Sequence, residues 1–112
     1  NICTNQALMA LASLIAILWY GKEGIARLAK TNYQRAAYLR TQMNNVMNEN
    51  VFNEFVVKMP KGAEGVFKKH NIAPGINLGR FFSGMKDSWL VAVTETKSKE
   101  QLDRYLEVLC KI

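Results

Sequence analysis

The segment from Ala7 to Trp19 constrains the fold most, because it holds thirteen residues of which only Ser13 is polar. As an α-helix it would be about 20 Å long, which is shorter than the roughly 30 Å hydrocarbon core of a bilayer. Thr4 and Asn5 are suitable N-cap residues, Gly21 is a stop signal, and no basic region typical of a signal peptide comes before them. We therefore expect a buried core helix without membrane contact, one face of which meets a further domain or subunit.

A chain of 112 residues with 49% hydrophobic content fits one domain, so we expect residues 1–112 to fold as a single unit. After the break at Gly21, residues 25 to 47 predict a second, amphipathic helix, followed by an asparagine-rich turn. Residues 1–50 would thus form two linking helices. The predicted apolar stripe, with one polar interruption, consists of Ile25, Leu28, Asn32, Ala36, Leu39, Met43 and Val46.

Residues 51–112 predict the order β-α-β-β-α, which is typical of a two-layer α+β fold with an antiparallel sheet carrying helices on one face. The best strand, Trp89 to Glu95, is almost continuously apolar and predicts burial on both faces. Ser98 and Gln101 form a capping box before a closing helix. The other predicted elements are a strand at Phe52–Met59, a helix at Ala63–His70 and a short strand at Ile76–Leu78.

The residue types present exclude most self-contained catalysis. The single histidine, His70, stands without a metal-ligand partner, and Cys3 and Cys110 lie at opposite ends of the chain without metal or disulfide spacing. No phosphate-binding glycine motif occurs, and no lysine lies in an apolar setting that would mark a Schiff-base amine. We therefore predict no catalytic, cofactor-binding or metal-ligating residue in this chain.

Two positions invite a ligand. Asn1, Cys3 and Thr4 place small polar groups at the start of a helix, where N–H groups favour anions, although plain helix capping explains them equally well. Arg80 follows Gly79, which permits close backbone approach, and the guanidinium could hold a carboxylate or phosphate, although a plain surface arginine fits as well. We take Asn1, Cys3, Thr4 and Arg80 as candidate near-site or interface residues.

The net charge of +6 raises a second hypothesis, a stand-alone basic α+β module that binds RNA or another acidic partner. Such a module needs aromatic and basic residues together on central strands. Arg80, Phe81 and Phe82 come closest to that pattern, but they follow a glycine-containing loop, and the other basic residues are scattered along helices. Nucleic-acid binding is therefore the alternative and not the main interpretation.

The residue sequences of several segments resemble those of a known family. NICTNQALMALAS, GKEG, NEFVV, LGRF and LVAVTE, in this order and spacing, resemble the C-terminal part of the glycine decarboxylase (P-protein) family of the glycine cleavage system. Within the form of that family that is split over two chains, the sequence is similar to subunit 1, the alpha chain. The resemblance covers essentially the whole chain, and the opening NICTNQALMA is its most specific block.

The resemblance implies the small C-terminal domain of an aspartate-aminotransferase-like (fold type I) pyridoxal-phosphate enzyme. The implied reaction is glycine decarboxylation with transfer of the aminomethyl group to the lipoyl arm of the H-protein, in the cytoplasm. It also implies a heterotetramer in which subunit 2, the beta chain, carries the cofactor and its lysine. The family's large domain, which comes before this block, is absent from the chain, so we expect a piece that is inactive alone and contributes an interface.

Overall fold

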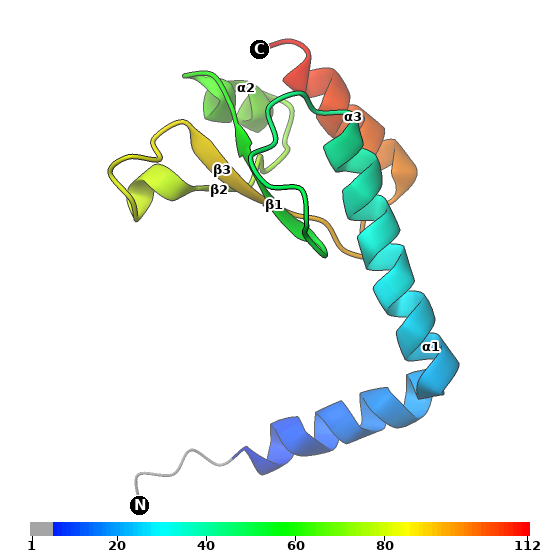
Figure 1. The fold of residues 1–112 in the computed structure, drawn as a ribbon. Coiled ribbons are helices and arrows are strands. Elements are labelled where there is room, and N and C mark those ends of the chain that lie inside the picture. Colours follow the sequence, from blue (N-terminus) through cyan, green and yellow to red (C-terminus); the bar gives the residue numbers. More distant parts are fainter. Residues whose placement is uncertain (1–5) are drawn as a thin grey trace, which may run out of the picture. The chain divides into compact units, whose positions relative to one another are not determined.

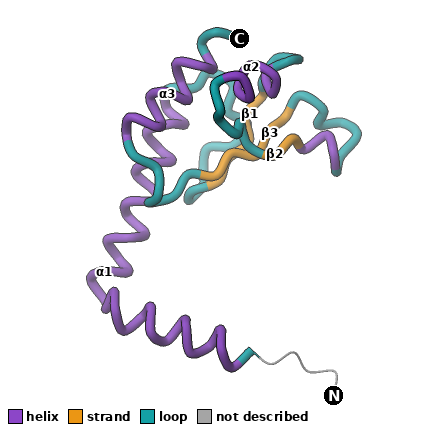
Figure 2. The backbone as a smooth tube through the Cα atoms, turned by 180° about the vertical axis from the view of Figure 1, so that it is seen from behind, coloured by secondary structure: helices purple, strands orange, loops and turns teal. Residues whose placement is uncertain are grey.

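The computed structural model describes residues 6–112, which form two units, one ending at Lys30 and the other running from Thr31 to Ile112. The first helix contributes to both units. Figures 1 and 2 show the elements along the chain. They are α1 (Ala7–Thr41), β1 (Glu54–Lys58), α2 (Ala63–Lys69), β2 (Ile76–Asn77), the 3-10 helix η1 (Leu78–Arg80), β3 (Ser88–Ala92) and α3 (Lys99–Leu109).

The unit that ends at Lys30 is helical, and its backbone leaves the helical region at Gly21, with φ 63° and ψ −179°. This is the predicted break. The apolar segment before it is exposed from Gln6 to Tyr20, and Trp19 is 85% exposed. The expected burial is therefore wrong within this chain, because no described residue covers the segment. The predicted outside neighbour stays a prediction.

By length and composition alone, α1 is the one helix among residues 6–112 that could cross a membrane. Core helices of soluble proteins and signal sequences pass the same test, so the observation is weak evidence. The interruption at Gly21 leaves about 21 Å of regular helix from Ala7 to Tyr20. That length is again less than a bilayer core requires.

The unit from Thr31 onward is built on an antiparallel sheet with the strand order β1-β3-β2. Pairing of Phe55 with Val91 and of Val57 with Trp89 places their side chains on one face. Three helices pack on that face, so the predicted two-layer α+β architecture is confirmed. The shared core consists of Ala36, Leu39, Met43, Phe55, Val57, Met59, Ala63, Phe67, Trp89, Val91, Val93, Leu102, Tyr105 and Val108.

The other face of β3 is more open than predicted. Ser88 is buried, but Leu90 is half-buried and Ala92 is exposed. The expectation that β3 is buried on both faces is therefore wrong. The sheet has three strands, and the core residues of α1, α2 and α3 pack on its other face, which leaves Ala92 exposed within residues 6–112.

α1 ends at Thr41, before the predicted end at Met47. The following residues pair instead with the outer edge of β1, through a bridge between Val46 and Val57 and a 2.8 Å bond from Met47 N to Val56 O. The Asn48 side chain also accepts from Val56 N at 2.8 Å. These tertiary hydrogen bonds compete with the last helical turn and shorten the helix.

Candidate functional site

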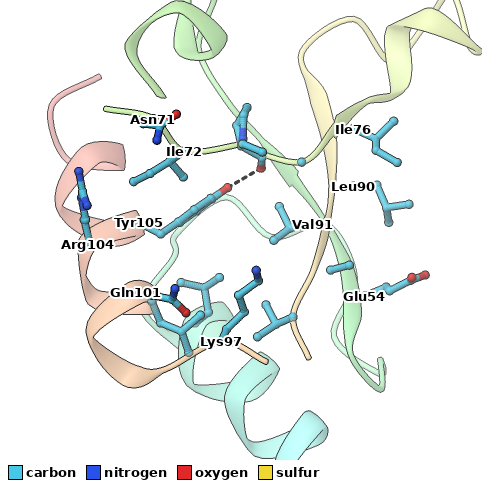
Figure 3. A pocket seen from close by; sticks show the side chains of 17 residues that line it. Glu54, Asn71, Ile72, Ile76, Leu90, Val91, Lys97, Gln101, Arg104 and Tyr105 are labelled. Atoms are coloured by element: carbon cyan, nitrogen blue, oxygen red, sulfur yellow. Dashed lines mark hydrogen bonds between the residues drawn. The ribbon is translucent and has the colours of Figure 1, made fainter. Parts of the chain in front are cut away.

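A pocket of about 550 Å³ lies beside β3, within the unit from Thr31 onward (Figure 3). Pairing of β2 with β3 ends at the Ile76–Leu90 pair, although β3 continues to Ala92. The pocket forms where residues 71–75 leave the strand edge and α3 closes the other side. It is lined by Leu39, Glu54, Asn71, Ile72, Ala73, Pro74, Gly75, Ile76, Leu90, Val91, Ala92, Val93, Lys97, Gln101, Leu102, Arg104 and Tyr105.

Pro74 and Gly75 explain why the ladder stops. Continuation of the register would bring Pro74 opposite Ala92, but proline has no N–H to donate, and the regular pairing has already ended at Ile76. Gly75 has a φ of +127°, and a Cβ built there would lie 2.4 Å from the Leu90 carbonyl oxygen. Only glycine fits this approach, so the sequence Pro74-Gly75 both ends the strand pairing and sets the pocket wall.

Tyr105 of α3 fixes the opposite wall. Its hydroxyl donates to the Pro74 carbonyl at 2.7 Å, and its ring lies 4.7 Å from that of Phe67, between centroids. Figure 3 shows the hydroxyl reaching across to the residue 74 segment. Burial raises the pKa of Tyr105 far above its ordinary value, so this hydroxyl stays protonated and acts as a structural donor.

The polar side chains of the pocket differ in direction. In Figure 3 the Lys97 side chain points into the pocket, whereas Glu54 points away from it. Arg104 is held at the rim, where its guanidinium donates to the His70 carbonyl at 3.1 Å. The Gln101 side chain accepts from Ser98 N at 2.9 Å as part of the predicted capping box, which is confirmed.

A second polar cluster joins α1 to α3 outside the pocket. The Tyr38 hydroxyl donates to Asp103, and Lys99 pairs with the same carboxylate at 2.8 Å. The hydrogen bond from Lys99, followed by that from Tyr38, lowers the pKa of Asp103, and the bond to Asp103 raises the pKa of Lys99. Asn32, the predicted polar interruption of the stripe, accepts from Glu95 N. These contacts connect α1 to α3 and to the segment before it.

Arg80, the predicted near-site residue, lies at the end of η1 and outside the pocket. Its guanidinium pairs with Glu64 at 3.6 Å, and both side chains are exposed. It does meet a carboxylate, but one of its own chain. Gly79 permits the close approach that was expected, since a Cβ there would lie 2.7 Å from the Cα of Lys86. The other three candidates, Asn1, Cys3 and Thr4, lie outside the described residues.

The described residues offer no catalytic constellation. Residues 6–112 contain no group of three His, Cys, Asp or Glu side chains that could hold a metal ion. Every lysine in that range is exposed, whereas a lysine that holds a cofactor needs an enclosed setting. The described residues therefore offer no enclosed lysine of the kind that holds pyridoxal phosphate. Phe81 and Phe82, which the RNA hypothesis needed on a central strand, follow η1 instead.

Sequence reasoning missed this pocket. The signal was present in the run Ile72 to Gly75, where a proline and a glycine come directly before a weak strand. We interpreted that run as an irregular loop. The pocket depends on the register of β2 against β3 and on the position of α3, and both are long-range properties that local patterns do not carry.

Fold and site together define a two-layer α+β unit that has a ligand-sized, mostly apolar pocket and no catalytic set of its own among residues 6–112. The sequence model of the glycine cleavage system P-protein family matches residues 1–109. The chain therefore belongs to the glycine cleavage system P-protein family, as the resemblance predicted.

Curated relatives agree with this assignment. A protein of Protochlamydia amoebophila, named probable glycine dehydrogenase (decarboxylating) subunit 1, is 51% identical over 99% of this chain. Proteins of the same name from Geotalea daltonii and Staphylococcus aureus (strain JH9) are 36% and 41% identical over 97% and 96% of the chain. The chain spans only about a quarter of these relatives, with 27%, 27% and 25% of their lengths covered.

A solved structure supports the fold. The crystal structure of a glycine decarboxylase (P-protein) of the glycine cleavage system, in inhibitor-bound form, matches 99% of this chain and 27% of its own with a TM-score of 0.78. The sequences are 24% identical, so this likeness speaks for the fold alone. Nothing in the comparisons supports the RNA-binding alternative.

Proposed function

We propose that this chain is part of the alpha subunit of a two-chain glycine decarboxylase. The whole protein would decarboxylate glycine and pass the aminomethyl group to the lipoyl arm of an H-protein. The observation that carries the proposal is the 51% identity, over 99% of the chain, to a protein named as subunit 1 of that enzyme. The chain would be the small C-terminal domain of a fold type I enzyme and would work in the cytoplasm.

In this proposal the chain contributes structure and interfaces while the chemistry takes place elsewhere. Pyridoxal phosphate, which supplies the electron sink for decarboxylation when bound, would be held by subunit 2. The exposure of every described lysine supports that division of labour. The apolar surface of the segment before Gly21 supports contact with the rest of the subunit or with its partner in a heterotetramer.

The test is reconstitution of the full-length parent subunit with subunit 2, pyridoxal phosphate and H-protein. We expect exchange of labelled bicarbonate into the glycine carboxyl group only when both subunits are present. The parent subunit alone should give no visible absorbance of a lysine-bound cofactor on titration. A cofactor-loaded parent that decarboxylates glycine without subunit 2 would overturn the proposal. Equal exchange by subunit 2 without this parent would also overturn it.

A further inference from the structure

The pocket contains an open stretch of sheet edge. Val93 N donates to Asn53 O at 2.9 Å, on the β1 side of the sheet. Backbone groups alternate sides along an antiparallel strand, so the Ala92 N–H and C=O point to the β2 side. There Pro74 has no N–H, and its carbonyl accepts the Tyr105 hydroxyl at 2.7 Å. Within residues 6–112 no backbone bond joins Ala92 to Pro74, so the donor and acceptor of Ala92 face the pocket and not a partner strand.

A cation lines the same pocket. Figure 3 shows the Lys97 side chain directed into the pocket, from the turn before α3. No ion pair or side-chain hydrogen bond engages its ammonium within the described range 6–112. Of the other charged lining residues, Glu54 points away and Arg104 is held by the His70 carbonyl. The pocket thus presents a backbone N–H and an ammonium together, which favours a carboxylate.

The remaining walls are mostly apolar and surround a volume suited to a small ligand. Ile72, Leu102 and Val91 contribute side chains from the loop, α3 and β3. At about 550 Å³ the pocket falls within the range of small-molecule sites, which typically combine apolar walls with a few convergent polar groups. The apolar walls require an apolar body in the ligand, next to the anionic group.

We propose that this pocket binds an N-acylated apolar amino acid. Its carboxylate would accept from the Ala92 N–H and the Lys97 ammonium, its amide N–H would donate to the Ala92 C=O, and its side chain would contact Ile72 and Leu102. One such residue completes the hydrogen-bonded pair that Pro74 leaves unformed, as an added strand does at a sheet edge. An acylated nitrogen is favoured over a free amino group, because a second ammonium in the pocket would be repelled by that of Lys97.

Two kinds of ligand carry these chemical groups, namely a small acylated amino acid and the carboxyl terminus of a polypeptide. The experiment titrates the full-length parent subunit with N-acetyl-L-leucine, with the tripeptide acetyl-Ala-Ala-Leu, and with N-acetyl-L-leucinamide, using isothermal titration calorimetry. We expect saturable binding of the first two probes and binding of the amide at least about tenfold weaker, because it lacks the charge. Tighter binding of the tripeptide assigns the site to polypeptide termini, and tighter binding of N-acetyl-leucine assigns it to small ligands.

Two variants and one control variant test where the ligand binds. Lys97→Met keeps the apolar stem and should weaken N-acetyl-leucine at least about tenfold, whereas Lys111→Met, which removes an exposed lysine outside the pocket, should leave affinity unchanged. Ala73→Trp should block the pocket, since Ala73 is exposed on its wall. The proposal fails if no probe saturates the parent subunit, if the amide binds as tightly as the acid, or if Lys97→Met and Lys111→Met behave alike.

Discussion

At the scale of single residues, Gly75 contributes more to the stability of the β2–β3 pairing than its exposed position suggests. Its φ of +127° is a region that side chains rarely adopt, and a Cβ would meet the Leu90 carbonyl oxygen at 2.4 Å. We expect Gly75→Ala to lower the local stability of the β2–β3 pairing by about 2 kcal/mol or more, from backbone strain and steric overlap. Amide hydrogen exchange at Leu90 in the parent subunit measures this local opening.

Gly65 gives the matched control for that substitution. It lies inside α2, and a Cβ built there meets nothing within 4 Å. Gly65→Ala should therefore stabilise α2 by about 0.5–1 kcal/mol, since alanine loses less backbone entropy than glycine. If both variants change amide exchange to the same extent, the steric account of Gly75 is wrong.

The pKa of Asp103 predicts how the stability of the protein depends on pH. Hydrogen bonds from Lys99 and Tyr38 lower its pKa in the folded protein. A lowered folded pKa means that the stabilisation is present above the unfolded pKa, about 3.9, and is lost as the pH falls through the folded value. We expect Tyr38→Phe to raise the Asp103 pKa, and the stability difference from wild type to shrink below about pH 4.

Carboxyl-carbon NMR titration of Asp103 measures the shift directly. The control is Tyr33→Phe, because Tyr33 is an exposed tyrosine on the same helix and is absent from the interactions that shift Asp103. Tyr38→Phe should move the Asp103 titration upward while Tyr33→Phe leaves it in place. An Asp103 that titrates at its ordinary value in the wild type would contradict the role of this cluster.

At the scale of elements, α3 begins with a complete capping box. Ser98 accepts from Gln101 N at 3.3 Å, and the Gln101 side chain accepts from Ser98 N at 2.9 Å. We expect Ser98→Ala to destabilise the first turn of α3 by about 1 kcal/mol, because the Gln101 N–H loses the hydroxyl that accepts from it. Hydrogen exchange at the Gln101 and Leu102 amides in the parent subunit measures the opening of this turn. Ser83→Ala, in an exposed turn, should leave that exchange unchanged.

Elements set by short-range patterns were predictable. The alternation of Phe55, Val57 and Met59 marked β1, and all three side chains are buried as expected. Elements that depend on contacts with residues distant in the sequence were less predictable. The end of α1 depends on a bridge from Val46 to β1, and the open face of β3 depends on where the helices pack. The same holds for the pocket, since the end of the β2–β3 pairing before Ala92 follows from the sheet register.

At the scale of the whole molecule, the apolar segment from Ala7 to Tyr20 has no cover within the described chain. Leu14 is 53% exposed and Leu18 is 73% exposed, although leucines in a continuous apolar surface of this kind are normally buried in a partner. The chain spans about a quarter of its curated relatives, and the further length that those relatives have would be enough to cover the segment. This difference in length makes the rest of the parent protein, or its partner subunit, the expected cover.

If that cover exists, a charge placed in the segment must be buried without a partner. Leu14→Glu should therefore destabilise the parent protein by several kcal/mol or block its assembly with subunit 2. Lys22→Glu, at an exposed polar position just after the Gly21 interruption, should have little effect. Thermal unfolding and size-exclusion chromatography of the purified parent with its partner measure both outcomes. Tolerance of Leu14→Glu equal to that of Lys22→Glu would refute a covered interface, and recovery of the wild-type parent in the membrane fraction would assign the segment to lipid instead.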